Sequence, residues 1–348
     1  MYTEIKKNLR QIEQQTLKEY LAAKSFPKYT FNQINDWLWN KKVLQIDQMS
    51  NLSKTVRTTL EQDFSLASLE IDREQESTDG TIKIRFKTQD GFFIESVMIP
   101  TENRLTACLS SQVGCSLTCS FCATGKMKRK RNLQSVEIFE QFLILNKKCL
   151  DKFNKPLTNI VYMGMGEPLL NYHHVLQSID FISNANFCGL SPKRITLSTA
   201  GISKQIRQLA DDKVRFNLAV SLHAADDAKR EKIMPINKTN NLQDLKEALL
   251  YFYNETEGDI SLEYILFKGF NDSSEDAQNL IKFYRQIPIR LVNIIEYNSI
   301  GDNFFRKTSE EDCQQFVDIL QKNRVNTRIR KSRGPDIDAA CGQLANKN

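Results

Sequence analysis

The period of the hydrophobic positions changes twice along this chain and divides it into three segments. In residues 1–65, apolar side chains recur every three or four positions in a polar background, as in Phe31, Ile34, Trp37 and Leu38. This spacing is that of one face of an amphipathic helix. We therefore expect residues 1–65 to form a small N-terminal helical accessory domain.

Residues 66–100 follow the two-residue period of a β-strand instead. Apolar and polar side chains alternate through residues 81–87, the second run covers residues 92–100, and Asp90-Gly91 lies between the two. An Asp-Gly pair between strand-like runs is a strong signal for a tight hairpin turn. The segment is therefore predicted to be a β-hairpin that links the helical domain to the rest of the chain.

From residue 101 to residue 348, short apolar runs alternate with longer amphipathic ones. The predicted strands are Thr106–Ser110, Asn159–Met163, Arg194–Ser198, Asn217–Ser221, Ser261–Leu266, Val292–Glu296 and Thr327–Arg330. The predicted helices between them include Val136–Cys149, Leu242–Asn254 and Ser274–Gln286. Alternation of strands and helices is typical of a parallel sheet built from βα units.

Two parallel α/β architectures fit this pattern, a Rossmann fold and a (β/α) barrel. The run Met163-Gly164-Met165-Gly166-Glu167 lacks the third glycine of a dinucleotide fingerprint, and the sequence contains no P-loop motif. We therefore expect an α/β fold in which residues 101–348 form a partial (β/α)6 barrel. Its chemistry would lie at the carboxyl ends of the strands.

Composition and the lack of long apolar runs indicate where in the cell the protein works. Apolar residues make up 41% of the chain and charged residues 26%, which is ordinary for a globular protein. No run approaches the ~18 apolar residues of a transmembrane helix, and the N-terminus lacks the apolar region of a signal peptide. We expect a cytoplasmic protein without a membrane partner. In that reducing compartment, eight cysteines indicate metal or redox chemistry rather than a disulfide framework.

Three of these cysteines, Cys115, Cys119 and Cys122, have the C-x3-C-x2-C spacing of the radical S-adenosylmethionine (SAM) signature. Three thiolates can hold three irons of a 4Fe-4S cluster, and the fourth iron stays open for the amino and carboxylate groups of SAM. A zinc site would need a fourth cysteine or histidine at matching spacing, and the three histidines form no such pair. The spacing therefore favours a cluster over zinc.

Polar residues follow several of the predicted strands. Gly166-Glu167-Pro168 comes directly after one strand, and a carboxylate there suits the ammonium group of an amino acid. Ser198, the Ser221-Leu222-His223 run and Asn298 end later strands, where their polar groups can bond a carboxylate, a ribose or a base. Each of these, taken alone, is better explained as a turn or a helix cap. Together with the cysteine motif they predict a ligand site at the barrel mouth.

Two basic runs and two further cysteines lie near the same end of the barrel. Lys126–Arg131 follows the cysteine motif, and Arg328–Arg333 precedes Cys341. Cationic side chains beside a reactive loop can neutralise phosphates and bind nucleic acid, although a charged run can also be a solvated face. Cys341 lies between small residues near the C-terminus, and Cys108 lies on the strand that enters the cysteine loop. Both are candidates for thiol chemistry.

In combination, these segments resemble the bacterial dual-specificity radical SAM methyltransferases that methylate C2 of adenosine in 23S rRNA and tRNA. The resemblance implies a radical SAM barrel with the N-terminal helices as an RNA-binding accessory domain. Relatives that methylate C8 of adenosine tend to carry alanine after Gly-Glu, so Pro168 favours C2 here. The matching segments are Ser110–Gly125, Met163–Asn171, Ser221–Ala224, Met234–Asn237 and Asp336–Leu344.

The resemblance also implies roles for individual residues. The three cysteines of the motif would hold the cluster, and Cys341 would take a methyl group from SAM. Cys108 would resolve the covalent RNA adduct through a transient disulfide with Cys341. Glu95 matches the position of the proton acceptor, and whether Glu95 or Cys108 removes the proton stays open. The residues that would contact SAM are Gly166, Glu167, Ser198, Ser221, Leu222, His223 and Asn298.

The implied reaction consumes two SAM molecules per product. A 5′-deoxyadenosyl radical takes a hydrogen atom from the methyl group on Cys341, and the resulting radical adds to the adenine. The implied targets are the peptidyl-transferase region of 23S rRNA and position 37 of tRNA. We expect a monomer served by a flavodoxin-type reductant. The alternatives are an adenosine C8 methyltransferase of the same superfamily and a non-catalytic, metal-containing RNA-binding protein.

Overall fold

The N-terminal helices pack around a small core of their own. The computed structural model describes residues 6–301 and 304–347, and its first helices are α1 (Gln14–Ala23), α2 (Tyr29–Asn35) and α3 (Lys54–Asp63). The hydroxyl of Ser53 caps α3 by accepting a hydrogen bond from the backbone N–H of Val56 at 3.3 Å. The buried members of this core are Leu9, Leu17, Leu21, Ile34, Leu38, Ile46, Met49, Leu52, Val56, Leu60 and Leu66.

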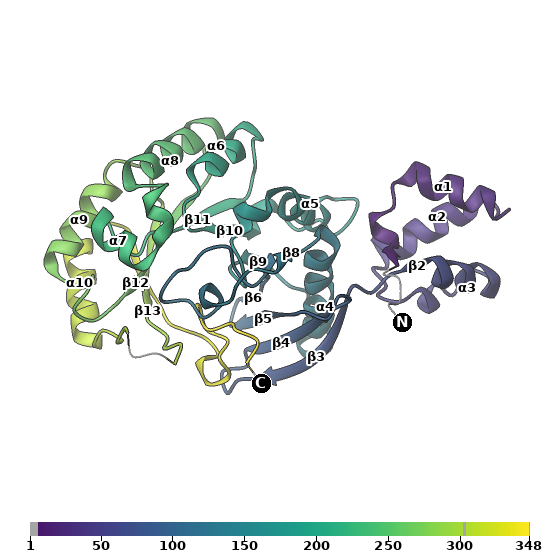
Figure 1. The fold of residues 1–348 in the computed structure, drawn as a ribbon, viewed down its shortest axis with the longest axis horizontal. Coiled ribbons are helices and arrows are strands. Elements are labelled where there is room, and N and C mark those ends of the chain that lie inside the picture. The colour runs from purple at the N-terminus through teal and green to yellow at the C-terminus, as the bar shows by residue number, and fades with distance from the viewer. Residues whose placement is uncertain (1–5, 302–303, 348) are drawn as a thin grey trace.

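One aromatic side chain joins these helices to the rest of the protein. Trp39 packs against Phe139, Phe181 and Phe187, with ring centroids 6.1, 5.1 and 4.4 Å away. Figure 1 shows the N-terminal helices to one side of the molecule, next to the end that carries α4 and α5. The position of the N-terminal segment therefore depends on an aromatic contact with the larger core.

The larger core is built on one ten-stranded sheet with the order β14-β13-β12-β11-β10-β9-β6-β5-β4-β3. Its antiparallel part runs through β3 (Leu69–Glu76), β4 (Ile82–Thr88), β5 (Phe93–Thr101) and β6 (Arg104–Cys108). From β6 onward the strands are parallel, with β9 (Asn159–Tyr162), β10 (Ile195–Thr199), β11 (Asn217–Ser221), β12 (Ile260–Leu266), β13 (Leu291–Glu296) and β14 (Thr327–Arg330).

An α-helix follows each parallel strand except β14, and most of these helices cover the outer side of the curved sheet (Figure 1). This confirms the predicted α/β fold, with six βα units and β14 as an additional parallel strand. None of the helices within the described ranges is both long and apolar enough to cross a membrane. The helices are α4 (Ser135–Phe153), α5 (Tyr172–Ser183), α6 (Ser203–Asp211), α7 (Asp227–Ile233), α8 (Leu242–Thr256), α9 (Ser274–Tyr284) and α10 (Glu310–Lys322).

The predicted hairpin is present as β4 and β5, but it is part of a larger unit. Strand β3 pairs with β4 along its whole length and makes the hairpin a three-stranded antiparallel extension of the barrel sheet. Most side chains of β3 are exposed, so its sequence lacks the alternation that identifies a half-buried strand. Periodicity could therefore not predict this strand.

The two cores give a test of domain independence. Leu60 of α3 is fully buried, and Leu60→Ala should destabilise the N-terminal core by about 2–5 kcal/mol because it leaves a cavity. Trp37 packs against this core, whereas Trp39 also packs against the barrel, so the test is made in a Trp39→Phe background in which the fluorescence of Trp37 follows the N-terminal segment in a urea titration. If residues 1–65 fold as a separate domain, the fluorescence midpoint falls while the later circular dichroism transition stays in place.

Leu150→Ala is the matched control, because Leu150 is 44% exposed on α4. It should leave both transitions within about 0.5 kcal/mol of the parent protein. An equal shift of both transitions in Leu60→Ala would contradict independent domains.

Candidate active site

The three motif cysteines lie on one loop at the barrel mouth. The loop leaves the two-residue strand β7 (Gln112–Val113) and returns through a 3-10 turn at Thr124–Lys126 to β8 (Arg131–Asn132). Two hydrogen bonds from other parts of the chain hold this loop. The backbone N–H of Ser120 donates to the carbonyl of Ile233 at 3.0 Å, and the backbone N–H of Ala123 donates to the carbonyl of Gly342 at 2.7 Å. The loop is therefore held between α7 and the C-terminal tail.

The thiols on this loop are close enough to influence one another electrostatically. Burial raises the pKa of Cys115 to about 12, and the negative charge of Cys122 adds to the effect. Burial also raises the pKa of Cys119, with contributions from Cys122 and Cys115. Within residues 6–301 and 304–347, no three His, Cys, Asp or Glu side chains are arranged to hold a single metal ion. An iron-sulfur cluster distributes its thiolates over different irons, and three neighbouring thiols are a donor set that fits it.

Gly166 and Glu167 follow β9 and are fixed by the residues around them. Gly166 has φ +97°, and a Cβ atom there would lie 2.5 Å from the Cβ of Gln112. The Glu167 carboxylate accepts a hydrogen bond from the backbone N–H of Ala200 at 2.8 Å and another from that of Leu169 at 3.1 Å. Burial raises the pKa of Glu167 to about 7. A hydrogen bond from the Thr199 side chain lowers the pKa in opposition to burial, and the carboxylate, with four lone pairs and these three donors, can accept one more.

His223 is held as a neutral imidazole with a defined tautomer. Its Nδ1 accepts a hydrogen bond from the backbone N–H of Ile265 at 3.1 Å, and burial lowers its pKa to about 3. The proton must therefore lie on Nε2, which is left as a donor. The ring of Phe121, from the cysteine loop, contacts the imidazole edge-to-face at 4.7 Å. The buried amide of Asn271 donates to the His223 carbonyl at 2.6 Å and helps to hold its left-handed backbone, with φ +54°.

Ser198 and Ser221 face the same side of the sheet. Ser198 is in register with Ala219 on β11, and Ala219 and Ser221 are two residues apart on that strand. Leu222 continues from β11 and is fully buried. The predicted SAM residues on β10 and β11 are therefore brought together by the sheet.

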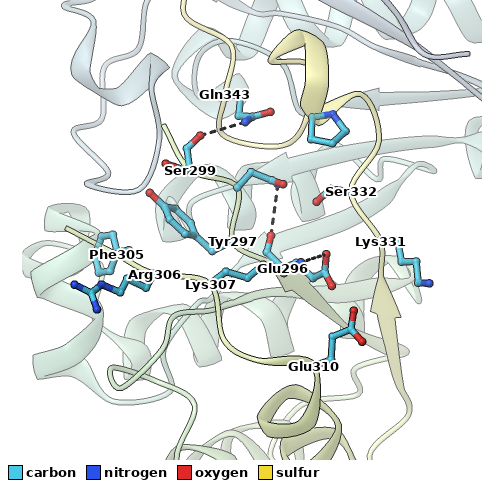
Figure 2. A pocket seen from close by; sticks show the side chains of 12 residues that line it. Glu296, Tyr297, Ser299, Phe305, Arg306, Lys307, Glu310, Lys331, Ser332 and Gln343 are labelled. Atoms are coloured by element: carbon cyan, nitrogen blue, oxygen red, sulfur yellow. Dashed lines mark hydrogen bonds and ion pairs between the residues drawn. The ribbon is translucent and has the colours of Figure 1, made fainter. Parts of the chain in front are cut away.

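Asn298 follows β13 and lines a pocket of about 680 Å³ together with residues of the C-terminal segment (Figure 2). Its side-chain amide donates to the carbonyl of Cys341 at 3.4 Å. Across the pocket, the Gln343 amide donates to the carbonyl of Ser299 at 3.1 Å. The pocket also contains the ion pair of Lys307 with Glu296 at 3.0 Å. Asn298 thus lies beside the tail that carries Cys341.

Arg230 is a buried residue that the sequence analysis missed. Its side chain is fully buried on α7 and donates to the carbonyls of Ala200 at 2.6 Å and Ser221 at 3.2 Å, beyond the end of β10 and at the end of β11. It also donates to the side-chain oxygen of Asn237 at 2.7 Å. The segment Met234–Asn237 resembles the family but carried no implied role. Nothing in the charged run around Arg230 distinguishes it from a solvated helix face.

Cys108 and Cys341 both lie near the barrel mouth, but no disulfide joins them. All eight cysteines are free thiols in this structure, so the transient Cys108–Cys341 disulfide that the resemblance implies is not supported. Burial raises the pKa of Cys108 to about 12, and the charge of Cys341 contributes in the same direction. Cys341 is only half-buried. The two thiols are thus within electrostatic range of each other, and Cys108 is the more buried of the two.

Glu95 is fully buried and is used to anchor the C-terminal tail. One carboxylate oxygen accepts hydrogen bonds from the backbone N–H groups of Ala345 at 2.9 Å and Asn346 at 3.1 Å. The other lies 3.5 Å from the ammonium group of Lys83. Glu95, one of the two candidate proton acceptors, therefore contacts the tail four residues beyond Cys341.

The two basic runs are only partly available to a ligand. Arg131 forms ion pairs with Asp90 at 2.6 Å and Glu137 at 2.7 Å, so it supports the loop rather than facing solvent. Arg330 pairs with Glu263 at 3.5 Å and is partly buried. Lys128, Arg129 and Lys130 are exposed, and Lys128 and Arg129 line a surface hollow of about 740 Å³ together with Cys115 and Cys119.

Gly166 gives a test of the packing beneath the site. Gly166→Ala should destabilise the protein by more than the strain of a positive φ alone, because the new Cβ would overlap Gln112. Gly91→Ala is the matched control: its φ is +82°, and nothing lies within 4 Å of the added Cβ. We expect a loss of about 1–2 kcal/mol for Gly91→Ala and a clearly larger one for Gly166→Ala in urea denaturation. Equal losses would mean that Gln112 moves aside without cost.

Comparison with known proteins agrees with this geometry. Residues 109–283 match the radical SAM superfamily, and residues 7–66 match the ribosomal RNA large subunit methyltransferase N-terminal domain. The probable dual-specificity RNA methyltransferases RlmN of Cytophaga hutchinsonii and Flavobacterium johnsoniae are 51% and 47% identical to this chain. These alignments cover 99% and 98% of this chain and 94% and 98% of the relatives.

A solved structure extends the similarity to the whole fold. The crystal structure of a radical SAM methyltransferase from Sphaerobacter thermophilus is 36% identical in sequence and superimposes with a TM-score of 0.92. The match covers 97% of this chain and 99% of that one. Because the barrel, the N-terminal helices and the cysteine loop are shared along nearly the full length, this chain belongs to the RlmN family of dual-specificity RNA methyltransferases within the radical SAM superfamily.

Proposed function

We propose that this protein methylates C2 of adenosine in the peptidyl-transferase region of 23S rRNA and at position 37 of tRNA, using a methyl group carried by Cys341. The main support is the docking of the C-terminal tail on the cysteine loop. The carbonyl of Gly342 accepts a hydrogen bond from Ala123 at 2.7 Å, and the carbonyl of Leu344 accepts one from the hydroxyl of Thr124 at 2.5 Å. The first of these hydrogen bonds joins the residue after Cys341 to the residue after Cys122, so it holds Cys341 close to the cysteine loop.

Cys115, Cys119 and Cys122 would hold a 4Fe-4S cluster, and Gly166, Glu167, Ser198, Ser221, Leu222, His223 and Asn298 would bind SAM. When bound, the cluster supplies the electron that cleaves SAM to a 5′-deoxyadenosyl radical. The protein's own groups fix the ligand. Glu167 accepts from an ammonium group, the Nε2–H of His223 donates to an acceptor, and the hydroxyls of Ser198 and Ser221 bond polar groups along the strand ends.

The thiol chemistry follows from the electronic character of adenine C2. This carbon is electron-poor, so a direct polar methyl transfer to it is unfavourable, and the methyl group is first taken up by a nucleophilic sulfur. A thiolate is both a good nucleophile and a group that can leave again. Cys341 would carry the methyl group, and Cys108 would help to release the product. Glu95 or Cys108 would accept the C2 proton, and Glu95 can do so only after the tail backbone leaves its carboxylate.

The partners follow from the same proposal. A target base must leave its stack to reach the barrel mouth, which favours unpaired loops of RNA. The domain formed by residues 1–65 would contribute to RNA binding, and Lys128, Arg129 and Lys130 would contact phosphates. We propose a cytoplasmic monomer that receives electrons from a flavodoxin-type protein.

The carrier role of Cys341 can be tested with the anaerobically reconstituted enzyme, tRNA and a 23S rRNA fragment. Mass analysis of the nucleosides should detect 2-methyladenosine with the parent protein, whereas 8-methyladenosine would assign the enzyme to the C8 class. Cys341→Ala should keep the cluster absorbance and lose all methyl transfer to RNA and protein. Cys108→Ala should still acquire a methyl group on Cys341 but accumulate RNA covalently attached to the protein.

Cys313→Ala is the matched control, because Cys313 is a free thiol on α10 outside the proposed site. It should methylate RNA normally. Normal methylation by Cys341→Ala would rule out the carrier, and the absence of a trapped species in Cys108→Ala would remove only Cys108 from the scheme.

The RNA surface can be tested by charge reversal. The triple variant Lys128→Glu, Arg129→Glu, Lys130→Glu should weaken binding of both RNAs and flatten the dependence of log K on log salt, by about 0.7–0.9 for each phosphate that the protein no longer neutralises. Filter binding at several salt concentrations measures both effects. The control reverses three exposed lysines on outer helices: Lys204, Lys282 and Lys322. If both triple variants lose the same affinity, net charge rather than this surface governs binding.

A further inference from the structure

One face of the antiparallel extension carries charged side chains whose arrangement the proposed function does not explain. Lys83 and Arg85 are two residues apart on β4, and Glu95 on β5 is in register with Arg85. Residues two apart on a strand, and residues opposite each other in an antiparallel pair, point to the same side of the sheet. Figure 1 shows the C-terminal segment beside these strands. The three side chains therefore form a charged face next to the tail.

Lys83 and Glu95 form an ion pair inside the protein. Lys83 is 3% exposed and Glu95 is 1% exposed, and the Lys83 ammonium lies 3.5 Å from one oxygen of the carboxylate. Lysine is almost never fully buried unless it is paired, because each buried N–H donor of its ammonium group needs an acceptor. The partners of this pair therefore indicate what the buried lysine does.

Those partners are the two ends of the loop that carries Cys341, which runs from Asp338 to Ala345 and which we call the Cys341 loop. The Lys83 ammonium donates to the carbonyl of Asp338 at 3.4 Å. At the other end, the second oxygen of Glu95 accepts from the backbone N–H of Ala345 at 2.9 Å. A compact loop whose ends lie close together is an Ω-loop, and such loops are frequently functional. One buried ion pair thus closes the Cys341 loop at both ends.

The segment before the Cys341 loop is held by different residues. The hydroxyl of Ser77 donates to the carboxylate of Asp336 at 2.6 Å, and the backbone N–H of Gly334 donates to the carboxylate of Asp79 at 3.0 Å. Ser77 and Asp79 lie in the connection between β3 and β4. The tail therefore has one attachment before the Cys341 loop and a second one across the ends of that loop. Loss of the second attachment would leave the first in place.

We propose that Lys83 is a positioning residue of the methyl-transfer site, which together with Glu95 closes the Cys341 loop and holds Cys341 against the cysteine loop. This inference rests on the proposed function for the role of Cys341. The ion pair holds the loop at its ends, and the hydrogen bond from Ala123 to Gly342 holds its middle. Catalysis depends on holding reacting groups in a productive geometry, so an open loop lowers the rate of methyl transfer rather than the affinity for RNA.

Hydrogen exchange tests the closure without SAM or RNA, so its result does not depend on the proposed function. Mass spectrometry of the reconstituted protein follows deuterium uptake in the Cys341 loop and, separately, in the segment before it. Lys83→Met should speed exchange of the Ala345 and Asn346 amides, which Glu95 binds, by about tenfold or more, and leave the preceding segment unchanged. Lys83→Arg should restore most of the protection, because it returns the charge and the N–H donors. Lys87→Met is the matched control, since Lys87 is exposed on the same strand, and it should exchange like the parent protein.

A double variant keeps the test decisive if Lys83→Met does not fold. Lys83→Met combined with Glu95→Gln replaces the buried pair by neutral side chains, so that no charge is left buried without a partner, and it should expose the same amides. Unchanged exchange in either folded variant overturns the proposal, as does equal exchange in Lys83→Met and Lys83→Arg. An increase spread evenly over the barrel also overturns it, because that would be a general loss of stability.

Kinetics of the reconstituted enzyme separate positioning from RNA binding. Lys83→Met should lower kcat for RNA methylation with little change in the KM for RNA, whereas a change in KM alone would contradict the positioning role. If the parent protein fails to methylate RNA, the proposed function fails while the exchange result stands.

Discussion

The structure of the barrel mouth depends on the hydrogen bonds made by one buried side chain, the guanidinium of Arg230. A fully buried guanidinium is costly unless each of its five N–H groups finds an acceptor. Arg230 meets this requirement with the side chain of Asn237 and with the backbone carbonyls of Ala200, Ser221, Leu222 and Asn240. The strand ends at Ala200 and Ser221 carry or adjoin the proposed SAM residues. The same helix accepts the cysteine loop through the carbonyl of Ile233. One buried charge therefore couples the strand ends that are proposed to bind SAM to the loop that would hold the cluster.

Much of the fold follows from local periodicity. The parallel strands and their helices were predicted within a few residues, because strands buried on both faces read as short apolar runs and amphipathic helices keep their period. Strand β3 was missed because its exposed side chains carry no such signal. The sequence indicated that the basic runs bind phosphates or face solvent, yet Arg131 and Arg330 are paired with carboxylates brought close only by folding. Pairing across the fold is not encoded in the spacing of either run.

The candidate site shows the same division between local and long-range information. The cysteine motif, Gly166-Glu167 and the ends of β10 and β11 could be identified because each follows a recognisable strand or a specific spacing. The contacts that surround these residues could not be predicted from the sequence. The contact of Gly166 with Gln112 joins distant segments, and the anchoring of the tail by Glu95 joins residues about 250 positions apart. No pattern within a short window predicts such contacts, and resemblance supplied the roles of Glu95 and Cys341.

The tail also bears on how the protein is made. Thr124 and Ala123 on the cysteine loop obtain hydrogen-bond partners from Gly342 and Leu344, which are among the last residues of this sequence to be synthesised. Chains generally fold from the N-terminus as they emerge from the ribosome. The barrel can therefore close its helices before the loop has its final partners. Until translation reaches residues 342–344, the loop lacks these two partners and remains accessible from the side that the tail later covers.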